Sequence, residues 1–243
     1  MKKITALFLL LIHTNSCFST IILIFFNKDN ILVVADSKEN NKTNTNGRKV
    51  CKILEKNNIV FAASGYIKNN KYDVISSIKK GIGNRVKLDL ETRTSILDST
   101  LSSLKEEMKL MKFYFRKEYD SIIMTKGPIV TVFIIGSVSD TPTAFIYPLV
   151  CIDLGNDILI KPIDFPPFKA KDSDNVLIDG DIDTVNNPYN KNLAKVKGAE
   201  QERYAIGLIA WQARKNSMFV DTPVSMVKVT KKGIIWRHKG VCQ

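Results

Sequence analysis

The sequence predicts an α+β fold, a four-layer αββα sandwich in which two stacked, mainly antiparallel sheets are flanked by helices. Two observations predict it. The strand-like segments are apolar at nearly every position, which is typical of strands buried on both faces. The order along the chain is strands, two helices, strands, a helix and a closing strand pair. This order predicts helices on both outer faces of the stacked sheets.

Two β-hairpins are expected at the start of the domain. Short apolar runs are separated there by polar, turn-like residues such as NKDN, and a longer polar stretch, Lys38–Arg48, is expected to be a loop. The expected strands are 20–26, 31–37, 50–54 and Asn58–Gly65.

The spacing of apolar residues then changes to that of helices. Two helices are expected at Tyr72–Ile82 and Thr92–Tyr119, and a third at Leu193–Lys215. The second is expected to pack through Ile96, Leu97, Leu101, Leu104, Met108 and Met111. The remaining strands are expected at Pro128–Val138, Thr143–Ile152, Val176–Ile178, Val224–Thr230 and Gly233–His238.

The N-terminus has the features of a cleavable secretory signal. A cationic MKK precedes the apolar run Ile4–Ile12, and the small residues Cys17 and Ser19 occupy positions −3 and −1 of a cut before Thr20. We therefore expect residues 1–19 to be a signal peptide and 20–243 to be one exported domain. The 224 residues left after cleavage suffice for a single core.

Two alternatives to cleavage stay open. Apolar character resumes at Ile21–Phe26, and the whole stretch approaches the ~20 residues of a membrane span, although the polar residues 13–16 interrupt it. Cys17 is also a candidate for lipidation, although Asn15 and Ser16 before it match that signal poorly. Membrane association is expected only if the N-terminus is retained or lipidated.

The chain is basic, with a formal charge of +12 that falls to +10 when Lys2 and Lys3 are removed. Such a charge is compatible with anionic surfaces or ligands. The basic residues are scattered and form no block with interleaved aromatic residues, so no nucleic acid is expected as a partner.

Three cysteines follow the expected cleavage site, namely Cys51, Cys151 and Cys242. Export permits disulfides, and the odd number leaves at least one thiol over. A Cys51–Cys151 bridge is a possible pairing. The cysteine spacings match no zinc site, and the acidic run Asp179–Asp183 lacks the rest of a calcium loop, so neither metal nor cofactor is expected.

The beginning of the expected mature chain resembles the N-terminal-nucleophile (Ntn) hydrolases, and within them the proteasome-β-subunit-like branch. The resemblance rests on Thr20, on ADS at Ala35–Ser37, on Lys52 in KVCKI and on ASG at Ala63–Gly65. Asp36 follows Thr20 by 16 residues and Lys52 follows it by 32, as in branch members whose site contains this triad. The resemblance is specific over the 46 residues from Thr20 to Gly65.

This resemblance implies that Thr20 is the nucleophile and that its own α-amine, with a reference pKa near ~8, is the base. Lys52 would favour the unprotonated amine, and Asp36 would hold the Lys52 ammonium. Backbone N–H groups of Ser64 and Gly65 would face the oxyanion. Singly, each of these residues has an ordinary structural explanation, such as a turn; together with their spacing and the cleavage site they favour catalysis.

Lys49 is a rival for the role of Lys52. The two lie three residues apart, so on one regular strand they would point to opposite faces. The spacing from Thr20 selects Lys52, whose ammonium is then expected beside both the Thr20 hydroxyl and the Asp36 carboxylate.

The chain also departs from the family. Where the branch has a Gly-Ser-Gly segment, this sequence has LIDGDID, so Asp179 or Asp181 would take the place of the serine in the proton path. A later Asp and Ser pair of the family has no clear match. Residues in about the right region, none of them assigned, are Asn216, Ser217, Asp221 and Thr222.

The leading hypothesis is therefore an exported N-terminal-threonine amide hydrolase, in the first place a peptidase, acting on a peptide or other amide substrate. The alternative is a non-catalytic Ntn-fold binding module that is anchored or lipidated at the cell surface. The resemblance is compatible with a homo-oligomer, because proteasome-like relatives stack into rings, and also with a monomer. The sequence does not identify the substrate.

Overall fold

The computed structural model describes residues 21–41, 44–49, 51–66, 72–170, 176–180, 188–189, 193, 195–215, 220, 222–240 and 242 of the chain, with the backbone alone for 38–49. The expected signal peptide and Thr20 lie outside these residues, as does Asp181. Among the described residues, no helix has the length and apolar character needed to cross a membrane.

The first of two large sheets contains both ends of the described chain. Its strand order is β11-β1-β2-β12-β13, and all neighbours are antiparallel. The strands are β1 (Ile22–Phe26), β2 (Asn30–Ala35), β11 (Val176–Asp179), β12 (Ser225–Thr230) and β13 (Gly233–His238).

The second sheet contains the middle of the chain in the antiparallel order β10-β8-β7-β6-β5, and β9 pairs with the end of β8. Short turns join β5 to β6 and β7 to β8, whereas residues 66–129 connect β6 to β7. In the β5–β6 turn both Asn57 and Asn58 have positive φ, as a two-residue hairpin loop requires. The strands are β5 (Ile53–Lys56), β6 (Ile59–Gly65), β7 (Val130–Val138), β8 (Thr141–Asp153), β9 (Ile158–Pro162) and β10 (Phe168–Lys169).

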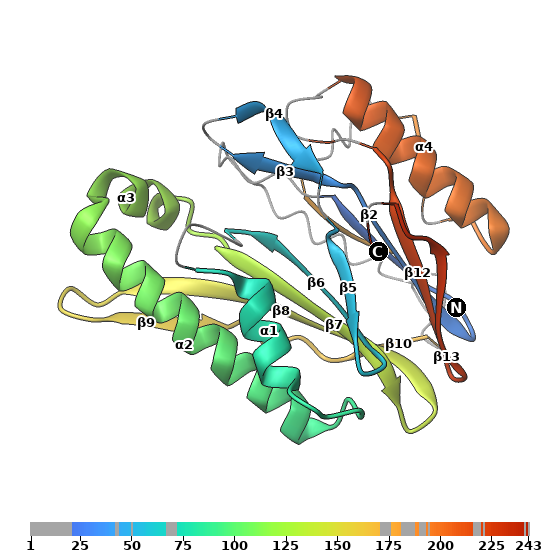
Figure 1. The fold of residues 1–243 in the computed structure, drawn as a ribbon, viewed down its shortest axis with the longest axis horizontal. Helices are drawn as coiled ribbons and strands as arrows, with labels where there is room; N and C mark the ends of the chain where they lie inside the picture. The colour runs from blue at the N-terminus through green and yellow to red at the C-terminus, as the bar shows by residue number, and fades with distance from the viewer. Residues whose placement is uncertain are drawn as a thin grey trace, which may run out of the picture.

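Helices cover the outer face of each sheet, so the expected four-layer sandwich is confirmed (Figure 1). Against the second sheet lie α1 (Val74–Ile82), α2 (Leu90–Tyr114) and α3 (Arg116–Met124). Against the first lies α4 (Ala199–Lys215). Asp73 caps α1 and Asp89 caps α2 by accepting from backbone N–H groups of the first turn.

The uniformly apolar sequence of β1 follows from its central position. Alternate residues of a strand point to opposite faces. Ile22, Ile24 and Phe26 therefore pack between the two sheets, whereas Leu23 and Phe25 pack toward α4. All five are buried.

Several element predictions were wrong. The expected loop at Lys38–Arg48 contains a small antiparallel pair, β3 (Lys38–Asn41) and β4 (Asn44–Lys49). The expected helix at Thr92–Tyr119 is two helices, because Phe115 has a non-helical backbone, φ −133 and ψ 54. The last helix begins at Ala199, just after Gly198 with φ +60. Strands β9 and β10 were not predicted.

The suggested Cys51–Cys151 bridge was also wrong, because Cys51 pairs with Cys242. Cys51 lies two residues before the start of β5, whereas Cys151 lies in β8, and β6 and β7 intervene in the sheet. Three strand spacings are roughly 14 Å, beyond the reach of a disulfide. Cys151 is a free thiol, and its burial raises its pKa to about 11.

Candidate active site

A buried ion pair joins the two sheets at the ends of their strands. Asp36 directly follows β2, and Lys52 directly precedes β5. The Lys52 Nζ lies 2.8 Å from Oδ1 and 2.9 Å from Oδ2 of Asp36. Asp36 is fully buried and Lys52 is 5% exposed. The expected contact between this ammonium and this carboxylate is therefore present.

The same carboxylate binds the beginning of the described chain. The Ile21 backbone N–H donates to Asp36 Oδ1 at 2.8 Å, and the Asp36 N–H donates to the Ile21 carbonyl at 3.2 Å. The Ile21 nitrogen is covalently bonded to the carbonyl carbon of Thr20. Asp36 Oδ1 thus accepts both from the peptide bond of the expected nucleophile and from the Lys52 ammonium. The second expected contact of Lys52, with Thr20, lies outside the described residues.

A buried ion pair needs an explanation other than stability. Removing two charges from water costs several kcal/mol per ion, and apolar residues of similar volume often serve stability as well or better. Buried charges in a defined pairing are instead typical of functional sites. The neighbours of the pair along the chain, Ala35 and Ile53, both belong to the apolar cluster between the two sheets.

Lys49 occupies a different element from Lys52. It ends β4 and pairs with Lys38 in the small sheet, whereas β5 begins only at Ile53. The assumption that the two lysines share one regular strand was therefore wrong.

Gly65 ends β6 in a conformation that requires glycine. Its φ is +89, and a Cβ atom there would lie 2.4 Å from the Ile129 carbonyl oxygen. A side chain would therefore displace the end of β6 or the chain before β7.

The ladder shows where the Gly65 N–H points. The Tyr66 N–H donates to the Ile129 carbonyl at 2.8 Å, on the β7 side. Successive N–H groups of a strand point to opposite neighbours, so the Gly65 N–H points to the β5 side and the Ser64 N–H to β7. The β5 ladder begins only with Ile53 opposite Ala62. The Gly65 N–H is thus directed beyond the first residue of β5, toward the segment that contains Lys52.

The hydroxyl of Ser64 connects the second sheet to β11. Ser64 Oγ donates to Oδ2 of Asp179, and both residues are buried. Asp179 is the last residue of β11 and lies opposite Ile22 of β1. It is therefore beside the start of β1, which is consistent with its expected place near the nucleophile.

Sequence reasoning missed two buried serines near the ion pair. Ser37 follows Asp36, and its hydroxyl has no hydrogen-bond partner among the described residues. Ser225 lies opposite Ala35 in the β2–β12 pairing, and its Oγ is 3.1 Å from the Cys242 sulfur. A short serine in an apolar strand is a weak signal. Of the unassigned residues, Thr222 is described and exposed, whereas Asn216, Ser217 and Asp221 lie outside the described residues.

Two solved structures resemble this fold over most of its length. Anbu, the ancestral beta-subunit from Yersinia bercovieri, has a TM-score of 0.54 at 10% identity and covers 90% of this chain and 87% of its own. The Anbu (Gly-1) mutant from Hyphomicrobium sp. strain MC1 has a TM-score of 0.53 at 13% identity, with 90% and 85% covered. The chain shares the fold of these Anbu proteins. Neither the protein-family models nor the curated proteins contain a match.

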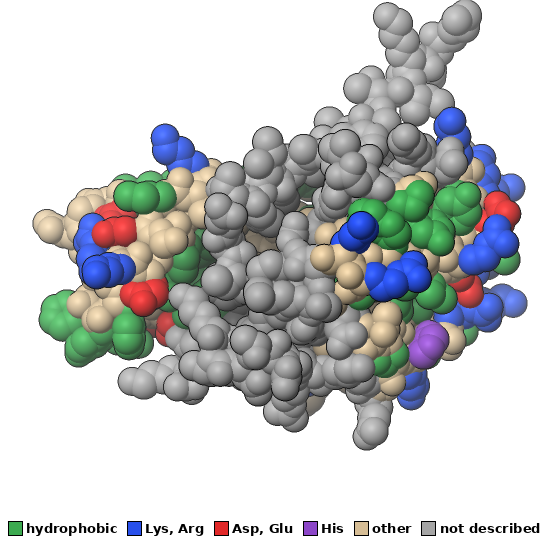
Figure 2. Space-filling view, turned by 90° about the horizontal axis from the view of Figure 1, so that it is seen from above, with side chains coloured by type: hydrophobic (Ala, Val, Ile, Leu, Met, Phe, Trp, Pro, Cys, Tyr) green, Lys and Arg blue, Asp and Glu red, His purple; other side chains and the backbone are tan. Residues whose placement is uncertain are grey.

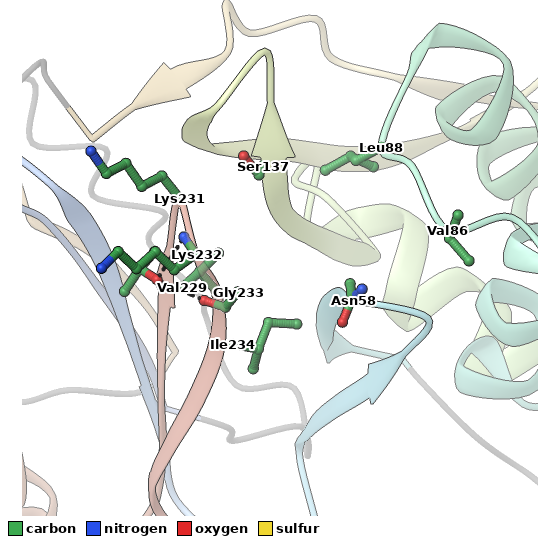
Figure 3. A pocket seen from close by; sticks show the side chains of 10 residues that line it. Asn58, Val86, Leu88, Ser137, Val229, Lys231, Lys232, Gly233 and Ile234 are labelled. Atoms are coloured by element: carbon green, nitrogen blue, oxygen red, sulfur yellow. Dashed lines mark hydrogen bonds between the residues drawn. The ribbon is translucent and has the colours of Figure 1, made fainter.

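The fold places the ion pair at one end of the sandwich, and an open pocket of about 220 Å³ lies at the other. It is lined by residues of the β12–β13 and β5–β6 turns, including Lys231, Lys232 and Asn58, and by Ser137 (Figure 3). Ser225, near the ion pair, and Thr230, in this pocket, are the two ends of β12, roughly 17 Å apart. The pocket therefore takes no part in the candidate site.

The described side chains form no single basic track on the side seen from above. Lys and Arg side chains lie at both ends of the described surface and are interspersed with apolar and acidic ones (Figure 2). Among the described residues, no group of His, Cys, Asp and Glu is arranged to hold a metal ion.

Proposed function

We propose that this protein is an exported threonine-type Ntn hydrolase that cleaves a peptide or other amide bond. Cleavage of the signal would expose Thr20. Its hydroxyl would attack the amide carbonyl while its own α-amine takes up the hydroxyl proton. The amide C–N bond would then break as the protonated α-amine gives this proton to the leaving amine, and water would hydrolyse the ester on Thr20 to release the acyl group as a carboxylic acid.

The observation that carries this proposal is the buried Asp36–Lys52 pair bonded to the Ile21 amide. It supports the roles expected for both residues, because a fixed positive charge near an amine lowers the pKa of that amine. A base must be unprotonated at working pH, so Lys52 would keep the Thr20 amine functional. Asp36 would orient Lys52 and the peptide bond after Thr20 together.

Two further contacts fit this chemistry. The direction of the Gly65 N–H suits an oxyanion donor on the Lys52 side, whereas the Ser64 N–H points into the ladder with β7. Losing such a donor typically costs ~3 kcal/mol of transition-state stabilisation. Asp179, held by Ser64, would replace the family serine near the amine.

The disulfide supports the proposed export. Disulfides persist in oxidising compartments and are rare in the cytosol of most organisms. The Cys51–Cys242 bridge agrees with a secretory signal at residues 1–19. One of the similar structures is an ancestral beta-subunit, so we also propose that copies of this chain assemble, which sedimentation of the mature protein would test.

The proposal is tested by turnover of Thr20→Ala and Thr20→Ser chains on a panel of fluorogenic peptides. We expect Thr20→Ala to abolish hydrolysis with little effect on folding, because one strand-end hydroxyl contributes little packing. Thr20→Ser keeps a hydroxyl and should retain part of the activity. Equal turnover by wild type and Thr20→Ala would exclude Thr20 as nucleophile.

The alternative, a non-catalytic binding module with this fold, is favoured by one observation, the aspartate in place of the family serine. It predicts a folded, correctly processed chain that hydrolyses no member of the panel.

A further inference from the structure

We propose that the Cys51–Cys242 disulfide is a positioning element of the Thr20 site: it fixes Lys52, and its reduction by a dithiol switches the hydrolase off. The inference rests on the proposed function. It starts from the fact that Cys51 is the residue directly before Lys52.

The disulfide connects the same two sheets as the ion pair. Cys51 leads into β5 of the second sheet, and Cys242 follows β13 of the first. Asp36 follows β2 of the first sheet, and Lys52 leads into β5. One covalent and one ionic link, one residue apart on the second sheet, thus hold its start against the first sheet.

Close packing fixes the far end of the disulfide. Ser225 is fully buried opposite Ala35, and its Oγ donates to the Lys239 carbonyl at 3.1 Å and contacts the Cys242 sulfur. At Gly240, with φ +58, a Cβ atom would lie 2.9 Å from Ser225 Oγ. The chain after β13 therefore lies directly on the start of β12, beside β2, which Asp36 follows. The ion pair, the disulfide and these contacts are therefore successive links between the start of β5 and the first sheet.

Solvent reaches the disulfide through an open pocket of about 270 Å³ that both cysteines line. At this pocket the Trp236 indole N–H donates to Glu55 at 2.8 Å, between the edge strands of the two sheets. A dithiol entering here would attack one sulfur through its thiolate and form a mixed disulfide. The second thiol of the dithiol would then attack the mixed disulfide. The products are two cysteine thiols and the oxidised, cyclic disulfide form of the reductant, so two electrons are transferred.

Reduction leaves the ion pair as the nearest remaining link between Lys52 and the first sheet. Among the described residues, the charged groups around the Ile21 amide are Asp36, Lys52 and, on the other side of β1, Asp179. If Lys52 moves outward, the negative charges of the two carboxylates are no longer offset by its ammonium. They stabilise the protonated form of the Thr20 amine, so the pKa of that amine rises. The acidic limb of the pH profile then moves to higher pH, which a general loss of stability would not cause.

The test uses the chain beginning at Thr20 with Cys151→Ser, in which Cys51 and Cys242 are the remaining cysteines. We would measure kcat/KM against pH for the oxidised protein, for the protein reduced with dithiothreitol, and for reduced protein re-bridged through one methylene group with diiodomethane. Reduced protein capped with iodoacetamide is the control. We expect at least a tenfold loss near neutral pH on reduction and an acidic limb higher by about one pH unit. Re-bridging should restore both, and capping should restore neither.

An unchanged profile after complete reduction would overturn the inference. If the reduced protein unfolds, the oxidised Ser225→Ala variant is measured in its place. We then expect the acidic limb of the pH profile to move in the same direction by a smaller amount. An unmoved limb would overturn the inference. If the oxidised protein shows no turnover at all, the proposed function fails, and hydrogen exchange decides the inference. Faster exchange at residues 51–54 than at the β5–β6 turn upon reduction supports it; equal change at both overturns it.

Discussion

At the scale of single residues, the proposed chemistry depends on charges that the fold removes from water. Lys52 and Asp36 are both buried, so either one without the other leaves an uncompensated charge in the interior. Such a change usually destabilises a protein by ~3 to 5 kcal/mol. By contrast, a surface pair is worth ~1 kcal/mol or less.

Lys52→Ala should therefore lower both turnover, by orders of magnitude, and the free energy of unfolding, by ~3 to 5 kcal/mol. Urea denaturation measures the second effect. Lys105→Ala is the matched control, because Lys105 meets Asp157 at 2.9 Å in a largely exposed pair and should cost under ~1 kcal/mol. For turnover, Lys49→Ala is the control and should change little. If Lys49→Ala reduced turnover as much as Lys52→Ala, the assignment would be wrong.

Gly65 offers a second residue-scale prediction. Gly65→Ala combines a positive φ with a Cβ atom 2.4 Å from the Ile129 carbonyl, so it should lower the free energy of unfolding by more than ~2 kcal/mol. Gly155→Ala has a similar φ of +82 but open space around it, and should cost about 1 kcal/mol. Thermal unfolding of both variants compares them. Equal losses would mean that the close approach at Gly65 is unimportant.

Residues were predictable where spacing carried information. The intervals from Thr20 to Asp36 and Lys52 anticipated the observed ion pair. The partner of Cys51 was not predictable, because strand order within a sheet decides which cysteines can meet. Ser225 was missed for the same reason: its position depends on a pairing between β2 and β12, which lie about 190 residues apart in the sequence.

At the scale of elements, one acidic side chain ties two helices to a strand turn. Asp153, at the end of β8, accepts from Lys112 of α2 at 2.6 Å and from Tyr119 of α3 at 2.9 Å. It also accepts from the Gly155 N–H at 2.8 Å. The Lys112 hydrogen bond, followed by the Gly155 one, lowers the pKa of Asp153 to about 2.

This pKa gives a pH prediction. The carboxyl group has a pKa near 3.9 in the unfolded chain, so its lowered folded value stabilises the protein above about pH 4. That contribution is lost as the pH falls from about 4 toward 2. Asp153→Asn should therefore have a lower urea midpoint than wild type at pH 7, and the two midpoints should converge near pH 2. A difference that stays constant across this range would contradict the assigned cause.

Elements were predictable where burial imposed an apolar pattern. Strands β1, β2, β6 and β7, buried on both faces, were found from composition alone. The pair β3 and β4 has a polar sequence, KENN and NTNGRK, without the alternation of a half-buried strand. The spacing of apolar residues continues across Phe115 from α2 into α3. The break between the two helices is therefore visible only in the backbone.

At the scale of the whole molecule, the layers explain why the site lies where it does. The first strand, β1, is the middle of three adjacent strands, between β11 and β2, so the first described residues lie at the end of a central strand. Elements from both sheets then converge beside it: Asp36 and Asp179 from the first, Lys52, Ser64 and Gly65 from the second. The fold class was predictable from element order and strand apolarity, whereas this convergence required the strand order.

The central claim is that this convergence serves a free amine on Thr20. The most direct test is the intact mass of the exported protein together with N-terminal sequencing, after expression of the full 243-residue chain in a secreting host. We predict a single mature species that begins at Thr20 and hydrolyses the peptide panel, and that loses this activity when one extra residue precedes Thr20. A mature chain that begins at any other residue, or full activity with the extra residue in place, would contradict the account.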